Sequence, residues 1–168
     1  MSKAFTREDD DAVDLPAPRR PLSTLPPGAK NYLTPDGAQR LRDQLEQLEK
    51  GERSSLADSA DPEAKSASQI IDGKILRLRE SLQSAVVVEP PSAAEMQVRF
   101  GATVTVRTRA GEEVIYRIVG VDEMDIDRGW VSWLSPIAKA LLNSRVGDQV
   151  RFKFPSGEDI LEIREIAY

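Results

Sequence analysis

The stretch SPIAKALLNSRVGD at residues 135–148 decides the fold of the C-terminal half of this chain. Ser135 can cap the free amides at a helix start, and Pro136 suits the first helical position because no amide hydrogen is needed there. Compact Ala and Leu residues follow, and Gly147 and Asp148 then predict a turn. The stretch therefore predicts a short helix and a turn in fixed order, directly after a strand.

The residues around this stretch alternate between apolar and polar with a period of two, as strands do. The pattern predicts strands at 103–107, 114–119, 130–134, 149–154 and 160–166, and a helix at 135–144. Turn residues separate most of these segments. Residues 96–168 are therefore predicted to form a small β domain, dominated by antiparallel strands, with one short helix.

Two helical stripes precede this domain. Helix start signals at 34–36 and 61–63 are each followed by apolar residues three or four positions apart. The two stripes consist of Ala38, Leu41, Leu45, Leu48, Ala67, Ile71, Ile75, Leu78 and Leu82. Because only a short polar turn at about 58–61 separates the arms, the second arm must fold back on the first. Residues 31–89 are therefore predicted to form an antiparallel coiled-coil hairpin.

The first thirty residues contain an acidic run and five prolines but few large apolar residues, which is typical of disorder. The predicted fold class is therefore α+β, with a disordered leader at 1–30, the hairpin at 31–89 and the β domain at 96–168. An exposed apolar seam on the hairpin would allow a dimer, so monomer and hairpin-mediated dimer both stay open.

Composition excludes several function classes. The 168 residues include no cysteine and no histidine, which rules out disulfides, thiol nucleophiles and imidazole catalysis and argues against zinc sites. The net charge of -5 divides as 0, -3 and -2 among the three parts, so we expect no direct sequence-specific DNA binding. The apolar runs are too short for a membrane span and no signal pattern is present, which predicts a cytoplasmic protein without a membrane partner.

Several segments, in one order, resemble the bacterial Gre transcription elongation factors (GreA/GreB). In the C-terminal half these are FGATVTVR (100–107), YRIVGVDEMD (116–125), GWVSWLSPIAKALL (129–142) and RVGDQV (145–150). In the N-terminal half they are YLTPDGAQRLRDQLEQL (32–48) and IDGKILRLRESL (71–82). The resemblance covers about residues 31–168, and the order of several motifs makes it specific.

The resemblance implies a partner and a division of labour. It implies a C-terminal domain folded like the FKBP prolyl isomerases that docks on the rim of the secondary channel of RNA polymerase, while the hairpin enters that channel. In the family, an acidic pair at the hairpin tip supports a catalytic magnesium of the polymerase during cleavage of backtracked RNA. The factor itself is then no enzyme and holds no cofactor or metal of its own.

The hairpin departs from the family pattern in length. Only 22 residues lie between Leu48 and Ile71, about fourteen fewer than in full-length Gre factors. Shared between two arms, the loss shortens the reach by about 10 Å at the helical rise. Because catalytic positioning tolerates errors of about 1 Å, we expect a modulator or competitor with weak or no stimulation of transcript cleavage.

The tip still contains carboxylates at Asp58, Asp61 and Glu63. One interpretation is a modified pair that supports magnesium. The other is structural, since Asp61 can cap the second helix before Pro62 and Glu63 suits its positive end. The second interpretation is favoured because proline stands where the family has asparagine after the second acid.

The resemblance assigns polymerase docking to Leu134, Ser135 and Pro136, although Ser135 and Pro136 also suit a purely architectural helix start. Trp130 and Trp133 would point to opposite faces of a strand. One of them is then either an exposed interface anchor or packed at the edge of the core. The alternative function is an FKBP-like prolyl isomerase or peptide-binding chaperone, which is weaker because aromatic residues are few.

Overall fold

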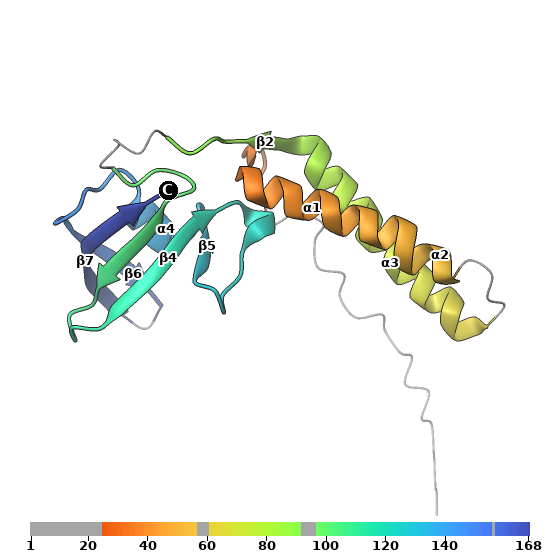
Figure 1. The fold of residues 1–168 in the computed structure, drawn as a ribbon. Helices are drawn as coiled ribbons and strands as arrows, with labels where there is room; N and C mark the ends of the chain where they lie inside the picture. Colours follow the sequence, from red (N-terminus) through yellow and green to blue (C-terminus); the bar gives the residue numbers. More distant parts are fainter. Residues whose placement is uncertain (1–24, 57–60, 92–96, 156) are drawn as a thin grey trace, which may run out of the picture.

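The computed structural model describes residues 25–56, 61–91, 97–155 and 157–168. A helical hairpin extends from one side of a curled sheet, and the two parts meet at the base of the hairpin (Figure 1). The α+β class predicted from sequence is confirmed. The greater part of the predicted leader, residues 1–24, lies outside the described residues.

The hairpin begins at the two predicted capping signals. Helix α1 (Pro35–Gln47) starts after Thr34, whose hydroxyl accepts the N–H of Gly37 at 3.0 Å. Helix α3 (Pro62–Ser84) starts after Asp61, whose carboxylate accepts the N–H of Glu63 at 3.0 Å. In both helices proline occupies the first helical position, as its fixed backbone angle and missing N–H favour.

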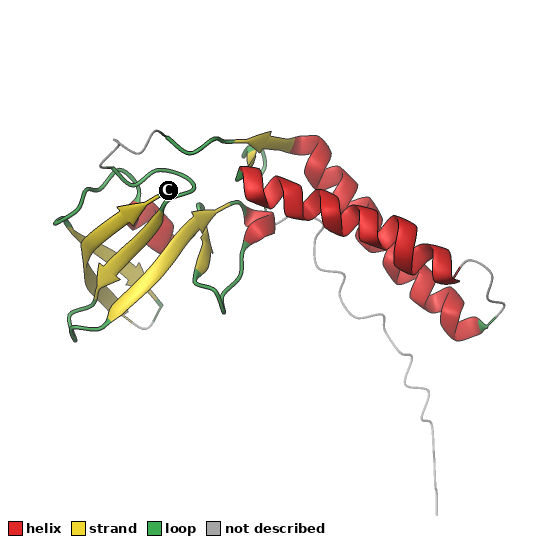
Figure 2. Ribbon diagram, viewed as in Figure 1, coloured by secondary structure: helices red, strands yellow, loops and turns green. Residues whose placement is uncertain are grey.

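The two arms pack through their apolar stripes and run back along each other (Figure 2). The buried apolar residues of this cluster are Leu33, Ala38, Leu41, Leu48, Ile71, Ile75 and Leu78. Leu45, Leu56, Leu82 and Ala85 pack at its edges. Most residues of the predicted stripes therefore face each other in this cluster, whereas Ala67 is half-buried outside it. The burial of this cluster is the main stabilising term for helices of this length.

The first arm changes its winding where the sequence has glycine. A π-helical turn spans Leu48–Glu52, in which the N–H of Arg53 bonds to the carbonyl of Leu48, and helix α2 (Arg53–Leu56) continues the arm. Gly51 lies in this turn. A side chain there would meet nothing within 4 Å, so packing does not require glycine.

The C-terminal part is a five-stranded sheet with the strand order β5-β4-β3-β7-β6. Its strands are β3 (Thr103–Arg107), β4 (Glu113–Val119), β5 (Trp130–Ser132), β6 (Gln149–Phe154) and β7 (Gly157–Ala167). Helix α4 (Pro136–Leu141) packs on the core side of the sheet. The buried core comprises Val98, Ala102, Val104, Val106, Ile118, Ala138, Leu141, Val150, Leu161 and Ile163.

The pairs β3–β4, β3–β7 and β6–β7 are antiparallel, as predicted for most of the sheet, whereas β5 pairs with β4 in parallel. Three boundaries differ from the sequence prediction. Strand β7 begins at Gly157 and not at residue 160, and strand β5 ends at Ser132, where the chain turns toward α4. The predicted helix at 135–144 ends at Leu141, since Leu142 is extended and Asn143 has a left-handed φ of 69°.

Three short elements at the base of the hairpin were not predicted. Strands β1 (Asn31–Leu33) and β2 (Ala85–Val87) form a parallel pair that joins the two ends of the hairpin. A 3₁₀ turn, η2 (Val121–Glu123), follows strand β4. Elements of three residues are too short to show a helical or strand period, so the sequence pattern contains no signal for them.

We expect Gly73→Ala to raise the stability of the protein by about 1 kcal/mol, because alanine is the better residue in a helix interior. Gly73 lies within α3, and a side chain there would meet nothing within 4 Å. Thermal unfolding measures the effect as a rise in Tm of about 2–4 °C.

Gly147→Ala is the matched control, since Gly147 is equally open but has a φ of +88°. It should lower the Tm, because alanine is strained in the left-handed region. A Gly73→Ala variant that melts at or below the temperature of the parent protein would contradict the prediction.

Candidate functional site

The carboxylates at the hairpin tip are positioned by the start of α3. Asp61 is exposed and caps the helix, and Glu63 is exposed in its first turn, where acids favour the positive helix end. Asp58 lies outside the described residues. Within the described part of the chain, no group of three or more acidic residues is placed to hold a metal ion. The structural interpretation therefore accounts for Asp61 and Glu63, and a role for the three acids in magnesium support stays a prediction.

The predicted docking loop is held by the start of α4. The hydroxyl of Ser135 accepts the N–H of Ala138 at 3.2 Å, and the hydroxyl of Ser132 accepts the N–H of Leu134 at 3.2 Å. Leu134 and Ser135 are half-buried, whereas Pro136 is exposed. The architectural role of Ser135 is therefore present, and Pro136 is the residue of the loop that lies open to a partner.

Both tryptophans are half-buried at the base of the hairpin. Three guanidinium groups lie over the ring of Trp130, with carbon-to-centroid distances of 4.4 Å for Arg40, 5.2 Å for Arg117 and 5.3 Å for Arg128. The ring of Trp133 lies 5.1 Å from that of Tyr32 and packs against the sheet core, whereas Trp130 is not part of that core. Packing at the edge of the core therefore describes Trp133, and a role of either tryptophan as an interface anchor stays a prediction.

Two acidic residues of η2 fasten the hairpin to the sheet. Glu123 is buried, and its Oε2 atom accepts the backbone N–H groups of Thr34 at 2.9 Å and Gly120 at 3.0 Å. Its other oxygen accepts the Thr34 hydroxyl. Asp122 accepts the hydroxyl of Ser81 and a side-chain N–H of Asn31 at 3.3 Å. We call this set of contacts between η2 and the hairpin base the joint.

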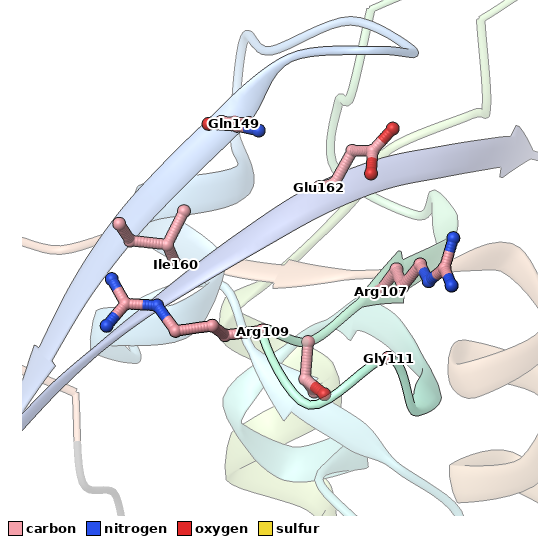
Figure 3. Close-up of a pocket in the computed structure, with 7 residues that line it drawn as sticks. Arg107, Arg109, Gly111, Gln149, Ile160 and Glu162 are labelled. Carbon is pink, nitrogen blue, oxygen red and sulfur yellow. The ribbon is translucent and has the colours of Figure 1, made fainter.

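Hollows lie at the joint and at the far end of the sheet. One of about 260 Å³ is lined by residues of the joint, among them Arg40, Glu123 and Trp130. Another of about 340 Å³ is lined by residues of the sheet domain, among them Arg107 and Glu162 (Figure 3). Their walls mix cationic and anionic side chains, which gives neither hollow a consistent charge for a ligand of one sign.

Comparison with known proteins identifies the family. Residues 93–168 match the family described as "Transcription elongation factor, GreA/GreB, C-term". A transcription elongation factor GreB of Neisseria meningitidis is 37% identical over 154 residues, covering 83% of this chain and 94% of that protein. A transcription elongation factor GreA of Alkalilimnicola ehrlichii is 38% identical over 156 residues, covering 83% and 99%. The chain belongs to the GreA/GreB family of transcription elongation factors.

The Gre family match takes in the whole sheet, and the relatives extend beyond it, since they cover 83% of the chain. Among solved structures, the GreA factor homolog 1 of Thermus thermophilus is 26% identical, covers 83% of this chain and 100% of that one, and has a TM-score of 0.38. The two relatives, at 37% and 38% identity over most of both chains, confirm the resemblance to Gre factors noted in the sequence as family membership. Among the described residues, no helix has both the length and the apolar character needed to cross a bilayer.

Sequence reasoning missed the joint of this Gre protein. Glu123 lies 89 residues from Thr34 along the chain, and the two acids of η2 stand in an acidic stretch that looks like a solvated loop. The one signal in the sequence is glycine, which is needed at two positions where η2 and the hairpin base approach each other closely. A side chain at Gly37 would lie 1.8 Å from the Glu123 carboxylate, and one at Gly120 would lie 2.1 Å from the carbonyl oxygen of Tyr32.

We expect Ser135→Ala to lower the free energy of unfolding by about 1 kcal/mol, because the variant loses the side-chain cap of α4. Urea unfolding followed by tryptophan fluorescence measures the change. Ser135→Asp keeps an acceptor for the Ala138 N–H and should restore most of the loss. Equal stability of Ser135→Ala and the parent protein would show that the cap contributes nothing.

Proposed function

We propose that this protein binds RNA polymerase at its secondary channel and regulates transcription elongation by occupying that channel, with weak or no stimulation of transcript cleavage. It is a binding protein of the cytoplasm and not an enzyme. In this proposal the sheet domain, at 96–168, has an FKBP-like fold and docks on the channel rim. The hairpin at 31–89 packs as a coiled coil and enters the channel. Membership of the Gre family supports the partner.

The length of the hairpin is the observation on which this proposal depends. Helix α3 has 23 residues, which is about 35 Å at 1.5 Å per residue. The Neisseria alignment has 154 positions yet takes in 83% of the 168 residues, or about 139. About fifteen aligned positions therefore face no residue of this chain. These missing positions agree with the shortening between Leu48 and Ile71. They support a hairpin that ends before it reaches the catalytic centre of the polymerase.

The chemistry of the tip supports the same conclusion. Asp61 already uses its carboxylate to cap α3, and Pro62 follows it in place of the asparagine of cleavage-competent factors. A carboxylate that supports magnesium must point toward the metal and lie within about 1 Å of its working position. Asp61 instead holds one oxygen on the backbone of α3, and the shortened hairpin ends before the catalytic centre, so occupying the channel is the function that we propose for the hairpin.

The proposed docking surface is the loop formed by Leu134, Ser135 and Pro136. Pro136 is exposed at the start of α4, so a partner can reach it. The aromatic residues Phe100, Tyr116 and Trp133 pack against the core of the sheet, and for this reason we do not favour prolyl isomerisation as a second function. The apolar seam of the hairpin is filled by its own two arms, which favours a monomer.

We expect the purified protein to bind bacterial RNA polymerase and to displace a full-length Gre factor at micromolar or lower concentration. Fluorescence competition with a labelled Gre factor measures this. Pro136→Glu should weaken the competition at least tenfold, since an acid suits the first turn of α4 but changes the proposed contact. Ile115→Glu, at a residue 57% exposed on β4, is the matched control and should stay within twofold of the parent. Absence of binding at micromolar concentration would end the proposal.

We also expect little or no RNA cleavage in stalled elongation complexes that contain this protein. A full-length Gre factor in the same assay provides the positive control. The double variant Asp58→Asn, Asp61→Asn should behave like the parent, because there is little cleavage to lose. Robust cleavage that disappears in the double variant would show that the tip acids support magnesium after all.

A further inference from the structure

We propose that Glu123 is a positioning residue that sets the direction in which the hairpin leaves the sheet domain. The inference rests on the proposed function, because a rigid finger can occupy a channel only when it points along that channel. In this proposal one buried carboxylate holds the hairpin and the sheet domain at a fixed angle to each other.

The carboxylate of Glu123 joins the start of the hairpin to the turn that follows β4. It accepts the N–H of Thr34 before α1, the N–H of Gly120 after β4, and the hydroxyl of Thr34. That hydroxyl in turn accepts the N–H of Gly37 in the first turn of α1. A side chain of η2 is therefore built into the start of the hairpin helix, where the positive helix end favours an anion. Neither part can turn without breaking these bonds.

Close packing around Glu123 prevents its carboxylate from moving to another position. Its side chain is 1% exposed. Gly37 and Gly120 do not have the positive φ that often explains glycine, and both are instead crowded by the joint. An added side chain at Gly37 would lie 1.8 Å from Oε1 of Glu123. The two glycines therefore allow the contact between helix and carboxylate, and any side chain at Gly37 must push the two apart.

An ion pair beside the joint, between β4 and α1, is a weaker constraint than the bonds of Glu123. The ion pair of Arg117 with Asp36, at 3.2 Å, involves an Asp36 side chain that is 71% exposed, and exposed pairs contribute about 0–1 kcal/mol. Removing Glu123 instead leaves buried N–H groups of Thr34 and Gly120 without their acceptor. Because unpaired buried donors are costly, the structure would relax by moving the hairpin.

The joint also touches the segment that leads to the proposed docking loop. Arg40 of α1 pairs with Glu123 at 3.4 Å and lies 4.4 Å from the ring of Trp130, the first residue of β5. Tyr32 of β1 packs on Trp133, which directly precedes Leu134. The base of the hairpin therefore packs directly against the segment that carries the docking loop. The direction of the hairpin is in this way fixed relative to the proposed docking surface.

The test measures the angle directly in the free protein. Because the chain has no cysteine, two introduced cysteines can be spin-labelled selectively, one replacing the exposed Lys65 on α3 and one replacing the exposed Glu113 on β4. Pulsed electron resonance then gives the distribution of distances between the labels. We expect one narrow distribution in the parent and a distribution at least twice as broad, or shifted, in Glu123→Ala.

Two further variants separate positioning from general damage. Gly37→Ala keeps the carboxylate but displaces it, and it should broaden or shift the distribution as Glu123→Ala does. Glu123→Gln keeps one oxygen acceptor and should give an intermediate width. Glu165→Gln, at an exposed glutamate of β7, is the control and should match the parent. Circular dichroism confirms in each case that helix and sheet content are retained.

A polymerase-binding assay on the same variants tests whether the angle between hairpin and sheet domain matters for function. The angle-broadening variants should compete with a full-length Gre factor at least fivefold less well than the parent. A distribution that stays narrow in both Glu123→Ala and Gly37→Ala would overturn the positioning role, whatever the polymerase result. A parent that fails to bind polymerase would instead overturn the proposed function, and the label distances would still decide the role of Glu123.

Discussion

The buried bond between the Glu123 carboxylate and the backbone at Thr34 is the constraint on which the arrangement of this protein depends. The hairpin and the sheet each have an apolar cluster of their own, so each is stabilised separately. Burial alone would allow them to meet at many angles, because the hydrophobic effect has no direction. Hydrogen bonds to a buried charge are directional and costly to break, and they select one angle.

The contacts of the joint all lie at the base of the hairpin. They involve strand β1, the first two turns of α1 and the last turn of α3, whereas the π-helical turn at Leu48–Glu52 and the tip lie farther along the arms. Residues can therefore be lost from the tip without disturbing either the joint or the core of the sheet. This separation allows the hairpin to be shortened at its tip while its base and the sheet domain stay as they are.

Much of the fold could be predicted from local sequence, and the reason is the same for each success. The capping signals at Thr34 and Asp61 act within three residues, and the apolar stripes repeat over several turns, so both are visible in a single segment. The joint could not be predicted, because it pairs residues 89 positions apart and contains no periodic pattern. The tryptophans show an intermediate case, since the alternation rule was sound but β5 ended at Ser132 before it applied to Trp133.

The glycines of the hairpin show how a residue type acquires meaning only from its surroundings. Gly37, Gly51 and Gly73 all stand in helical sequence, where glycine is unfavourable by about 1 kcal/mol relative to alanine. Around Gly51 and Gly73 there is open space, so the structure gives no packing reason for either. At Gly37 the carboxylate of Glu123 occupies the space that a side chain would need. The unfavourable helix propensity of glycine at position 37 is offset by the contact with Glu123. This contact ties the start of α1 to the sheet domain and so sets the direction of the hairpin.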